Sequence, residues 1–229
     1  MTLQRHNKGL TNGKKPLIIR MSATKGGDFL NNIITIGRQF GSGGREFGRR
    51  LAEELGYEYY DKEIITELAN RTELSEEYLR NVIERRPHML YPITVGHTMS
   101  AADSYYLRRQ QSIFSAQSEL LKELAQKSNC VIVGRCAGYI LKDFSPYRVF
   151  VYASIESRVK RCMERSSSTE GYSEKEIRKS IIEIDKHRAK YHYYHTGERW
   201  GDKNNYDLCI KTTDLVIKDV VPYIAKIFI

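Results

Sequence analysis

The chain has 229 residues, with 37 Lys and Arg against 28 Asp and Glu, a formal net charge of +9 and a pI near 9.3. Hydrophobic residues make up 41% and charged residues 28%, which is typical of a globular protein and excludes a disordered one. No segment approaches the roughly 18 apolar residues of a membrane span, and the N-terminus lacks the apolar core of a secretory signal. We therefore expect a cytoplasmic protein with no membrane partner.

The positive charge is spread unevenly along the chain. Residues 1–31 hold six Lys and Arg and one acid, a net charge of +5, whereas residues 32–229 carry only +4. The first segment is polar and has no periodicity apart from 17–21, which could form a short strand, so we expect a flexible basic tail. Residues 32–229 are too weakly basic for a general polyanion binder, which makes nucleic acid an unexpected partner.

Strands and helices are predicted to alternate from residue 33 onward. Short apolar runs bounded by turn residues predict strands, and apolar residues at helical spacing, such as Phe47, Leu51 and Leu55, predict helices. The predicted strands are 33–36, 57–60, 130–134, 148–153 and 206–211. The predicted helices are 45–55, 62–70, 75–86, 103–127, 137–141, 155–165, 173–191 and 217–228, with a loop at 87–100 and an aperiodic stretch at 192–205. This alternation predicts an α/β fold with a parallel sheet.

A glycine-rich segment, GRQFGSGGR at 37–45, lies between the first predicted strand and the first predicted helix. Glycines let the backbone approach an anion closely, and a helix N-terminus presents unpaired N–H groups and the positive end of the helix dipole. We therefore expect a loop that binds the phosphates of a nucleotide. Its residues are Phe40, Gly41, Ser42, Gly43, Gly44, Arg45 and Glu46.

Two phosphate-binding motifs each fit this loop incompletely. The dinucleotide motif G-x-G-x-x-G would begin at Gly41, but Glu46 replaces its third glycine, although Asp61 lies where the ribose-binding acid is expected. The P-loop motif G-x-x-x-x-G-K-[ST] can take Gly44 as its second glycine, with Arg45 for the lysine and Glu46 for the hydroxyl residue. That register keeps a cation for phosphates and an oxygen for Mg²⁺, whereas a register one residue earlier loses the cation.

Longer segments of the chain resemble the cytidylate kinase-like proteins, a branch of the P-loop nucleoside monophosphate kinases. The resemblance covers about residues 33–228. It rests on IITIGRQFGSGGREFGRRLAEELGYEYYDKEI at 33–64, CVIVGRCAGYIL at 130–141, RVFVYASIESRVKRCMER at 148–165 and DKHRAKYHYYHTGERWGDKNNYDLCIKT at 185–212.

This resemblance implies a fold and an activity. The fold is a three-layer P-loop domain over 32–229, with a parallel five-stranded core, a helical insertion for the nucleoside monophosphate at about 71–127 and a lid at about 158–200. The activity is ATP-dependent, Mg²⁺-assisted phosphoryl transfer from a nucleotide donor to a nucleoside monophosphate or a related small phosphorylated acceptor. The alternative is a kinase relative without catalysis that binds nucleotides or RNA phosphates. The sequence assigns neither the base of the acceptor nor an oligomeric state.

The resemblance also implies roles for individual arginines. Arg135 matches the arginine that holds the acceptor phosphate, but Cys136 replaces the aspartate that usually follows it and contacts the base. Arg188, in Asp185-Lys-His-Arg188, resembles the D-x-x-R of a lid. Bidentate guanidiniums suit phosphoryl oxygens, and Arg161 and Arg165 lie four apart on one helix face. The expected catalytic residues are therefore Arg45, Arg161, Arg165, Arg188 and Asp61, and the expected acceptor-binding residues are Asp61, Arg135 and Arg188. For the helical arginines, the alternative is a solvated face balanced by nearby acids.

Two further features have competing interpretations. Asp61, at the end of the second predicted strand, could orient the acceptor or hold Mg²⁺ through water, or it could cap the following helix. His187, His192 and His195 lie among tyrosines, and a metal site, a platform for the acceptor base, or packing of the lid against the sheet together with Trp200 would each use them. The third strand ends without an acidic residue, so the Mg²⁺ ligands stay unassigned.

Overall fold

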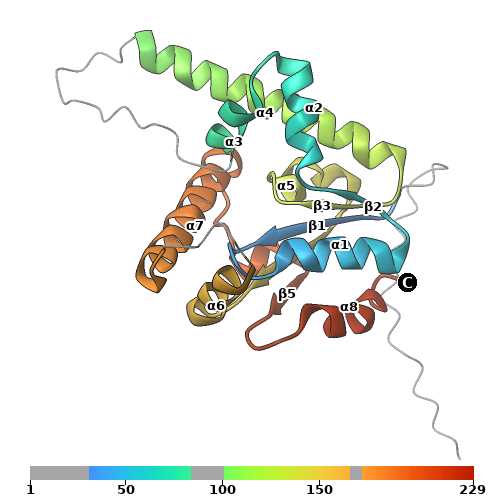
Figure 1. The fold of residues 1–229 in the computed structure, drawn as a ribbon. Coiled ribbons are helices and arrows are strands. Elements are labelled where there is room, and N and C mark those ends of the chain that lie inside the picture. The colour runs from blue at the N-terminus through green and yellow to red at the C-terminus, as the bar shows by residue number, and fades with distance from the viewer. Residues whose placement is uncertain (1–30, 84–100, 166–171) are drawn as a thin grey trace, which may run out of the picture.

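The computed structural model describes residues 31–83, 101–165 and 172–229 (Figure 1). Residues 1–30 of the predicted basic tail, with the possible strand at 17–21, and the predicted loop at 87–100 lie outside these residues. Among the described residues, no helix is both long enough and apolar enough to span a membrane.

Five strands form one parallel sheet in the order β2-β3-β1-β4-β5. Their bounds are β1 Ile33–Arg38, β2 Glu58–Tyr60, β3 Cys130–Val133, β4 Tyr147–Tyr152 and β5 Leu208–Lys211. β1 is central, because Ile36 pairs with Val133 of β3 on one side and with Val149 of β4 on the other. The chain order therefore reverses at β1, and the carboxyl ends of β1, β3 and β4 open onto the crevice where such sheets bind ligands.

Helices cover both faces of this sheet and complete a three-layer fold (Figure 1). α1 and α8 cover one face, α2 to α5 cover the other, and α6 and α7 lie beside the carboxyl end of β1. The helix bounds are α1 Gly44–Leu55, α2 Glu63–Thr72, α3 Glu76–Ile83, α4 Ala101–Lys127, α5 Ala137–Ile140, α6 Ile155–Arg165, α7 Glu174–Thr196 and α8 Ile217–Ala225. This arrangement confirms the predicted α/β fold with a five-stranded parallel sheet.

Alternate residues of the central strands divide between two buried clusters. Ile34 and Ile36 pack with Phe47 and Leu51 of α1, whereas Ile33 packs with the helices on the opposite face. Both faces are covered, which explains why β3 is buried at all four positions and has a continuous apolar sequence. The two layers hold the end of β1 rigidly at the crevice.

Several predicted boundaries are wrong by two or more residues, and two of these differences have a clear structural reason. β1 continues through Arg38, beyond the predicted end at 36, because its ladder with β4 continues as far as the pair of Arg38 with Val151. α7 continues to Thr196, beyond the predicted end at 191, and ends where Gly197 adopts φ 70°. The last turn of α7 lacks aliphatic residues at helical spacing because it packs with aromatic rings. One of these is Phe114 of α4, which stacks on His195.

Candidate functional site

The glycine loop joins β1 to α1 with a backbone that only glycine adopts readily. Gly41 has φ 75° and Gly43, the N-cap of α1, has φ 81°. A Cβ at Gly41 would lie 3.0 Å from the backbone oxygen of Arg158. No side chain caps α1, so its positive end faces the crevice without a competing carboxylate at the N-cap. The predicted phosphate-binding loop therefore has the backbone shape that this chemistry needs.

Ser42 lies inside the loop and is completely buried. Its hydroxyl donates a hydrogen bond to the Gln39 carbonyl at 2.8 Å, and its carbonyl accepts from the Thr212 hydroxyl at 2.7 Å. Arg161 of α6 also donates to the Ser42 carbonyl, at 3.3 Å, and to the carbonyls of Thr212 and Leu215. Arg161 and Ser42 thus join the loop to the segment after β5. Contact of either side chain with a ligand stays a prediction.

A buried ion pair connects the loop to α6 and α7. Arg158 of α6 forms a salt bridge with Asp185 of α7, and the two side chains are 9% and 13% exposed. Asp185 accepts a hydrogen bond from the Phe40 backbone N–H at 2.8 Å, and Arg158 donates to the Phe40 carbonyl at 3.2 Å. Burial raises the pKa of Asp185, while these donors oppose the rise. The sequence analysis did not assign this pair, although Asp185 lies in the motif that drew attention to Arg188.

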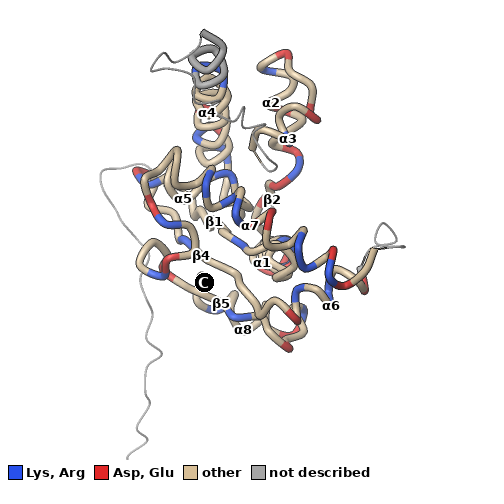
Figure 2. Tube along the Cα trace, turned by 90° about the vertical axis from the view of Figure 1, so that its left-hand side faces the viewer, with Lys and Arg blue, Asp and Glu red and all other residues tan. Residues whose placement is uncertain are grey.

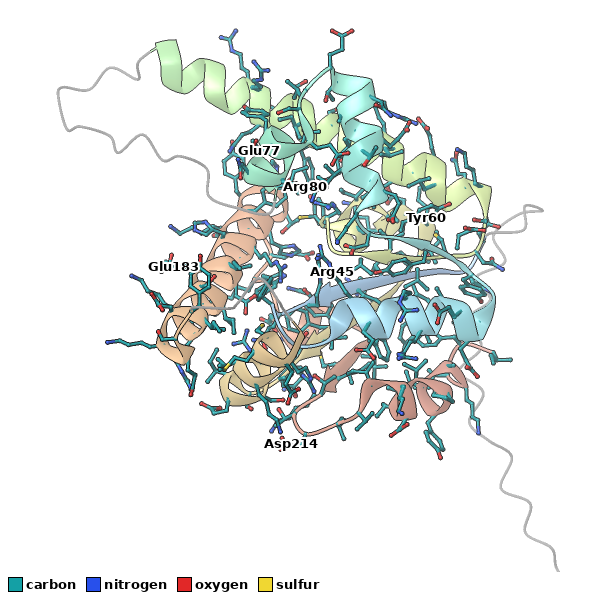
Figure 3. All side chains as sticks on the ribbon, in the orientation of Figure 1. Arg45, Tyr60, Glu77, Arg80, Glu183 and Asp214 are labelled. Atoms are coloured by element: carbon teal, nitrogen blue, oxygen red, sulfur yellow. The ribbon has the colours of Figure 1, made fainter. Side chains whose placement is uncertain are left out.

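Asp61 lies at the centre of a group of arginines. Its carboxylate is almost fully buried; Oδ2 lies 2.8 Å from Arg45 Nε, and Oδ1 lies 3.8 Å from Arg38 Nη2. The N-cap of α2 is Lys62 and has no side-chain capping bond, so the helix-cap interpretation of Asp61 is wrong. Figure 3 shows Arg45 in the middle of the molecule, where the ends of β1 and α1 face α7.

Arg135 approaches Asp61 from a strained turn after β3. Gly134, Arg135 and Cys136 all have positive φ, at 79°, 59° and 54°, a conformation that costs free energy at the two non-glycine residues. The turn directs Arg135 Nη2 to within 3.5 Å of the Asp61 carbonyl. The Arg135 carbonyl in turn accepts from the buried Gln117 amide of α4 at 3.0 Å. The predicted acceptor-binding residues Asp61 and Arg135 are therefore neighbours.

Arg188 of α7 reaches the same area from the other side. Its Nη1 donates to the Arg38 carbonyl at 3.2 Å and lies 3.6 Å from Asp185 Oδ1, while its Cζ lies 5.5 Å from the centre of the Phe40 ring. Figure 2 shows basic positions from several elements gathered near the ends of β1 and α7. The structure thus brings Arg45 and Arg135 to Asp61, and Arg188 to Arg38, whose guanidinium lies 3.8 Å from Asp61. The side chain of Arg165, the last residue of α6, lies outside the description.

Arg38 is the member of this group that the sequence analysis missed. It is 8% exposed, and a Cβ at Gly134 would overlap its guanidinium. Burial, and then the charge of Arg188, lower the pKa of Arg38, while Asp61 opposes this. A guanidinium nevertheless keeps its charge at neutral pH. Several buried or half-buried cations therefore face one carboxylate, which is an environment that favours a bound anion.

Two cavities open at this edge of the sheet. The larger, of about 600 Å³, lies between the glycine loop and the helices α6 and α7, and Glu46, Arg161 and Ile181 contribute to its lining. Its volume is in the range of small-molecule sites. The smaller, of about 70 Å³, lies at the ends of β1 and β3 and is lined in part by Arg135 and Cys136.

The histidines and aromatic rings pack α7 and the segment after it onto the rest of the fold. His195 stacks on Phe114 with ring centroids 4.1 Å apart, and Trp200 meets Phe150 of β4 edge-on at 5.4 Å. Burial lowers the pKa of His192 and lowers that of His195 to about 4, so both are neutral at pH 7. Among the described residues, no group of three or more His, Cys, Asp and Glu side chains could hold a metal ion. The packing interpretation is confirmed for Trp200.

The strand order and the glycine loop between β1 and α1 together define the fold of a P-loop kinase. The sequence model of the cytidylate kinase-like family matches residues 33–214. The chain therefore belongs to the cytidylate kinase-like family, and this decides between the two loop motifs in favour of the P-loop.

A curated relative agrees with this assignment, and solved structures share the fold. The chain is 28% identical, over 181 residues and 79% of each chain, to a cytidylate kinase of Thermococcus kodakarensis. The structure of an uncharacterized protein from Eubacterium ventriosum has a TM-score of 0.61 and 29% identity, covering 86% of this chain and 97% of its own. A shikimate kinase from Bacteroides thetaiotaomicron shares the fold, with a TM-score of 0.51, 13% identity and coverage of 86% and 98%.

Proposed function

We propose that this protein transfers a phosphoryl group from ATP to a nucleoside monophosphate, or to a related small phosphorylated acceptor. The supporting observation is the gathering of Arg45, Arg135 and Arg188 around Arg38 and Asp61, beside the glycine loop. Phosphoryl transfer depends on positioning and on neutralising charge more than on covalent chemistry by the protein. A set of planar guanidiniums at a sheet edge supplies both requirements.

The donor belongs in the larger cavity. Its wall carries Gly41, Gly43, Gly44 and Arg45 on one side, and this loop would bind the phosphates through its backbone N–H groups. The opposite wall comes from α6 and α7, which the Arg158–Asp185 pair connects to the loop. Closure of these helices over the nucleotide would exclude water from the transfer.

The acceptor belongs on the side of Arg135. The relatives that carry the name cytidylate kinase make CMP the first acceptor to test. Burial raises the pKa of the Cys136 thiol to about 12, so this residue is neutral and cannot replace the negative charge of an aspartate toward a base. We therefore expect weaker discrimination in favour of cytosine than an aspartate would give.

Mg²⁺ fits the residues present. It is usually bound by one or two carboxylates together with substrate phosphates, and Glu46 lines the larger cavity while Oδ1 of Asp61 is buried without a hydrogen bond among the described residues. Glu46 and Asp61 would hold the ion. When bound with the nucleotide, Mg²⁺ would neutralise phosphate charge that the arginines do not reach.

A coupled assay of ADP release across CMP, dCMP, UMP, AMP and GMP tests the proposal. We expect turnover with at least one acceptor, and a fall in kcat of roughly a hundredfold or more for Arg45→Ala, since comparable electrostatic contacts in other enzymes have that effect. Arg49→Ala is the matched control, because Arg49 is an exposed arginine of the same helix that pairs with Glu53. Its turnover should stay at the wild-type value.

The alternative is a nucleotide-binding or RNA-phosphate-binding module without catalysis, and the arginine in place of the P-loop lysine favours it. In that case, folded wild-type protein binds nucleotide but releases no ADP with any acceptor. Arg45→Ala would then lower only the affinity. Binding of RNA would in addition weaken steeply as salt rises.

A further inference from the structure

The larger and the smaller cavity meet at two arginines. Among the described residues that line them, Arg38 and Arg188 are the two that belong to both cavities. Arg38 comes from the end of β1 and Arg188 from α7, and Arg188 donates to the Arg38 carbonyl at 3.2 Å. A ligand that reaches from one cavity toward the other would therefore meet these two arginines.

The residues around Arg38 bury its side chain where the two cavities meet. Its side chain is 10% exposed, and its guanidinium occupies the space that a Cβ at position 134 would fill, so Gly134 leaves room for it. Its Nε is buried and has no hydrogen-bond partner among the described residues, and the salt bridge recorded for its guanidinium is a long one, 3.8 Å to Asp61. A cation that is buried in this way costs free energy unless an anion joins it.

The charges around Arg38 point to the same conclusion. Arg188, Arg45 and Arg135 all repel it, and Asp61, which also contacts Arg45, is the carboxylate that attracts it. A phosphate group between the cavities would relieve this repulsion and would accept two hydrogen bonds from a planar guanidinium. An uncharged ligand would do neither.

We infer that Arg38 contacts the terminal phosphoryl group of the donor and supplies part of the charge that the missing P-loop lysine would supply. The inference rests on the proposed function and names a further residue for it. In the transfer, the bond between the γ phosphorus and the bridging oxygen of ATP breaks, and ADP keeps the electron pair. An oxygen of the acceptor phosphate forms the new bond to phosphorus, in the place between the two cavities that Arg38 and Arg188 border.

Equilibrium binding of ATP and of ADP, measured by calorimetry, tests the inference without turnover. Arg38→Gln should weaken ATP binding by about ten- to a hundredfold, the effect of one charge-assisted hydrogen bond, and should leave ADP binding within about threefold. Arg45→Gln should weaken both ligands, since Arg45 lies on the loop. Arg49→Gln, on an exposed turn of α1, should change neither.

Each other outcome contradicts the inference in a recognisable way. Equal weakening of ATP and ADP would mean that Arg38 only supports the loop, and unchanged affinities would mean that it contacts no phosphate. Failure of folded wild-type protein to bind either nucleotide would instead contradict the proposed function. Thermal unfolding checks each variant; if Arg38→Gln does not fold, Arg38→Met removes the charge but keeps the apolar stem, and it should show a smaller preference for ATP than the wild type. A wild-type preference in Arg38→Met would then overturn the inference.

Discussion

Arg158 and Arg38 are both buried arginines at the carboxyl edge of one sheet, yet their surroundings differ. Arg158 is 7% exposed and finds a carboxylate and a carbonyl at hydrogen-bond distance. Arg38 is 8% exposed, faces two cavities and has its carboxylate at 3.8 Å. The comparison indicates that Arg158 stabilises the fold of the site, whereas the charge of Arg38 is available to an anion from outside the protein.

Removing the partner of Asp185 should have the largest effect on stability. Arg158→Met removes the Arg158–Asp185 pair and leaves the mostly buried carboxylate facing Arg188 at 3.6 Å. Breaking a buried pair typically costs about 3 kcal/mol or more in the free energy of unfolding. Urea unfolding measures this loss. The double variant Arg158→Met with Asp185→Leu, which removes both charges, should recover much of it. A single variant as stable as the wild type would show that the pair does not anchor the loop.

Gly134→Ala should have the next largest effect. The residue has φ 79°, and the added Cβ would overlap the Arg38 guanidinium, so a backbone cost of roughly 1–2 kcal/mol and a steric cost of roughly 1–3 kcal/mol act together. Gly56→Ala is the matched control, because Gly56 has φ 66° but no atom lies within 4 Å of the new Cβ. Urea unfolding should show a larger loss for Gly134→Ala than for Gly56→Ala. Equal losses of stability would mean that the Arg38 side chain moves aside at little cost in free energy.

The arginines of the site also show how much of it could be predicted from the sequence. The loop and Arg45 carry a local signal, since glycines follow a strand and precede a helix. Arg135 and Arg188 were found by resemblance. Arg38 has no local signal, because it ends an apolar strand and acquires its surroundings only where Gly134, from the turn after β3, lies against it.

The fold was easier to predict than the residues at which its helices and strands begin and end. β3 is a run of four buried apolar residues, and such runs identify central parallel strands directly. The last turn of α7 was not predicted because its contacts are aromatic: His195 packs on Phe114 and on Tyr191. A search for aliphatic residues at helical spacing does not detect such packing. The cap interpretation of Asp61 failed for a related reason, since its arginine partners lie on other elements.

The packing of α7 on α4 should depend on pH. Burial lowers the pKa of His195 to about 4, from about 6.5 in the unfolded chain. The unfolded state therefore binds the proton first, and stability should fall as pH falls from about 6.5 toward 4. From pH 7 to pH 5 we expect His195 to contribute a loss of about 1–2 kcal/mol, with the half-buried ring taken into account. His195→Phe keeps a ring against Phe114 and should flatten the profile from urea unfolding. An unchanged profile would assign the pH dependence to other groups.

Arg38→Met should have the smallest effect on stability, and this prediction tests the comparison most sharply. The lowered pKa of Arg38 means that the fold disfavours its charged form, so at neutral pH the charged side chain opposes folding. A methionine keeps the apolar stem and removes the repulsion from the other arginines, while Asp61 retains Arg45 at 2.8 Å. We expect the free energy of unfolding to change by less than about 1 kcal/mol or to rise, since apolar replacements of buried charges are often neutral or stabilising. Turnover should nevertheless fall, because residues at functional sites often support activity at some cost in stability. A loss of stability as large as that of Arg158→Met would show that both arginines only hold the fold together.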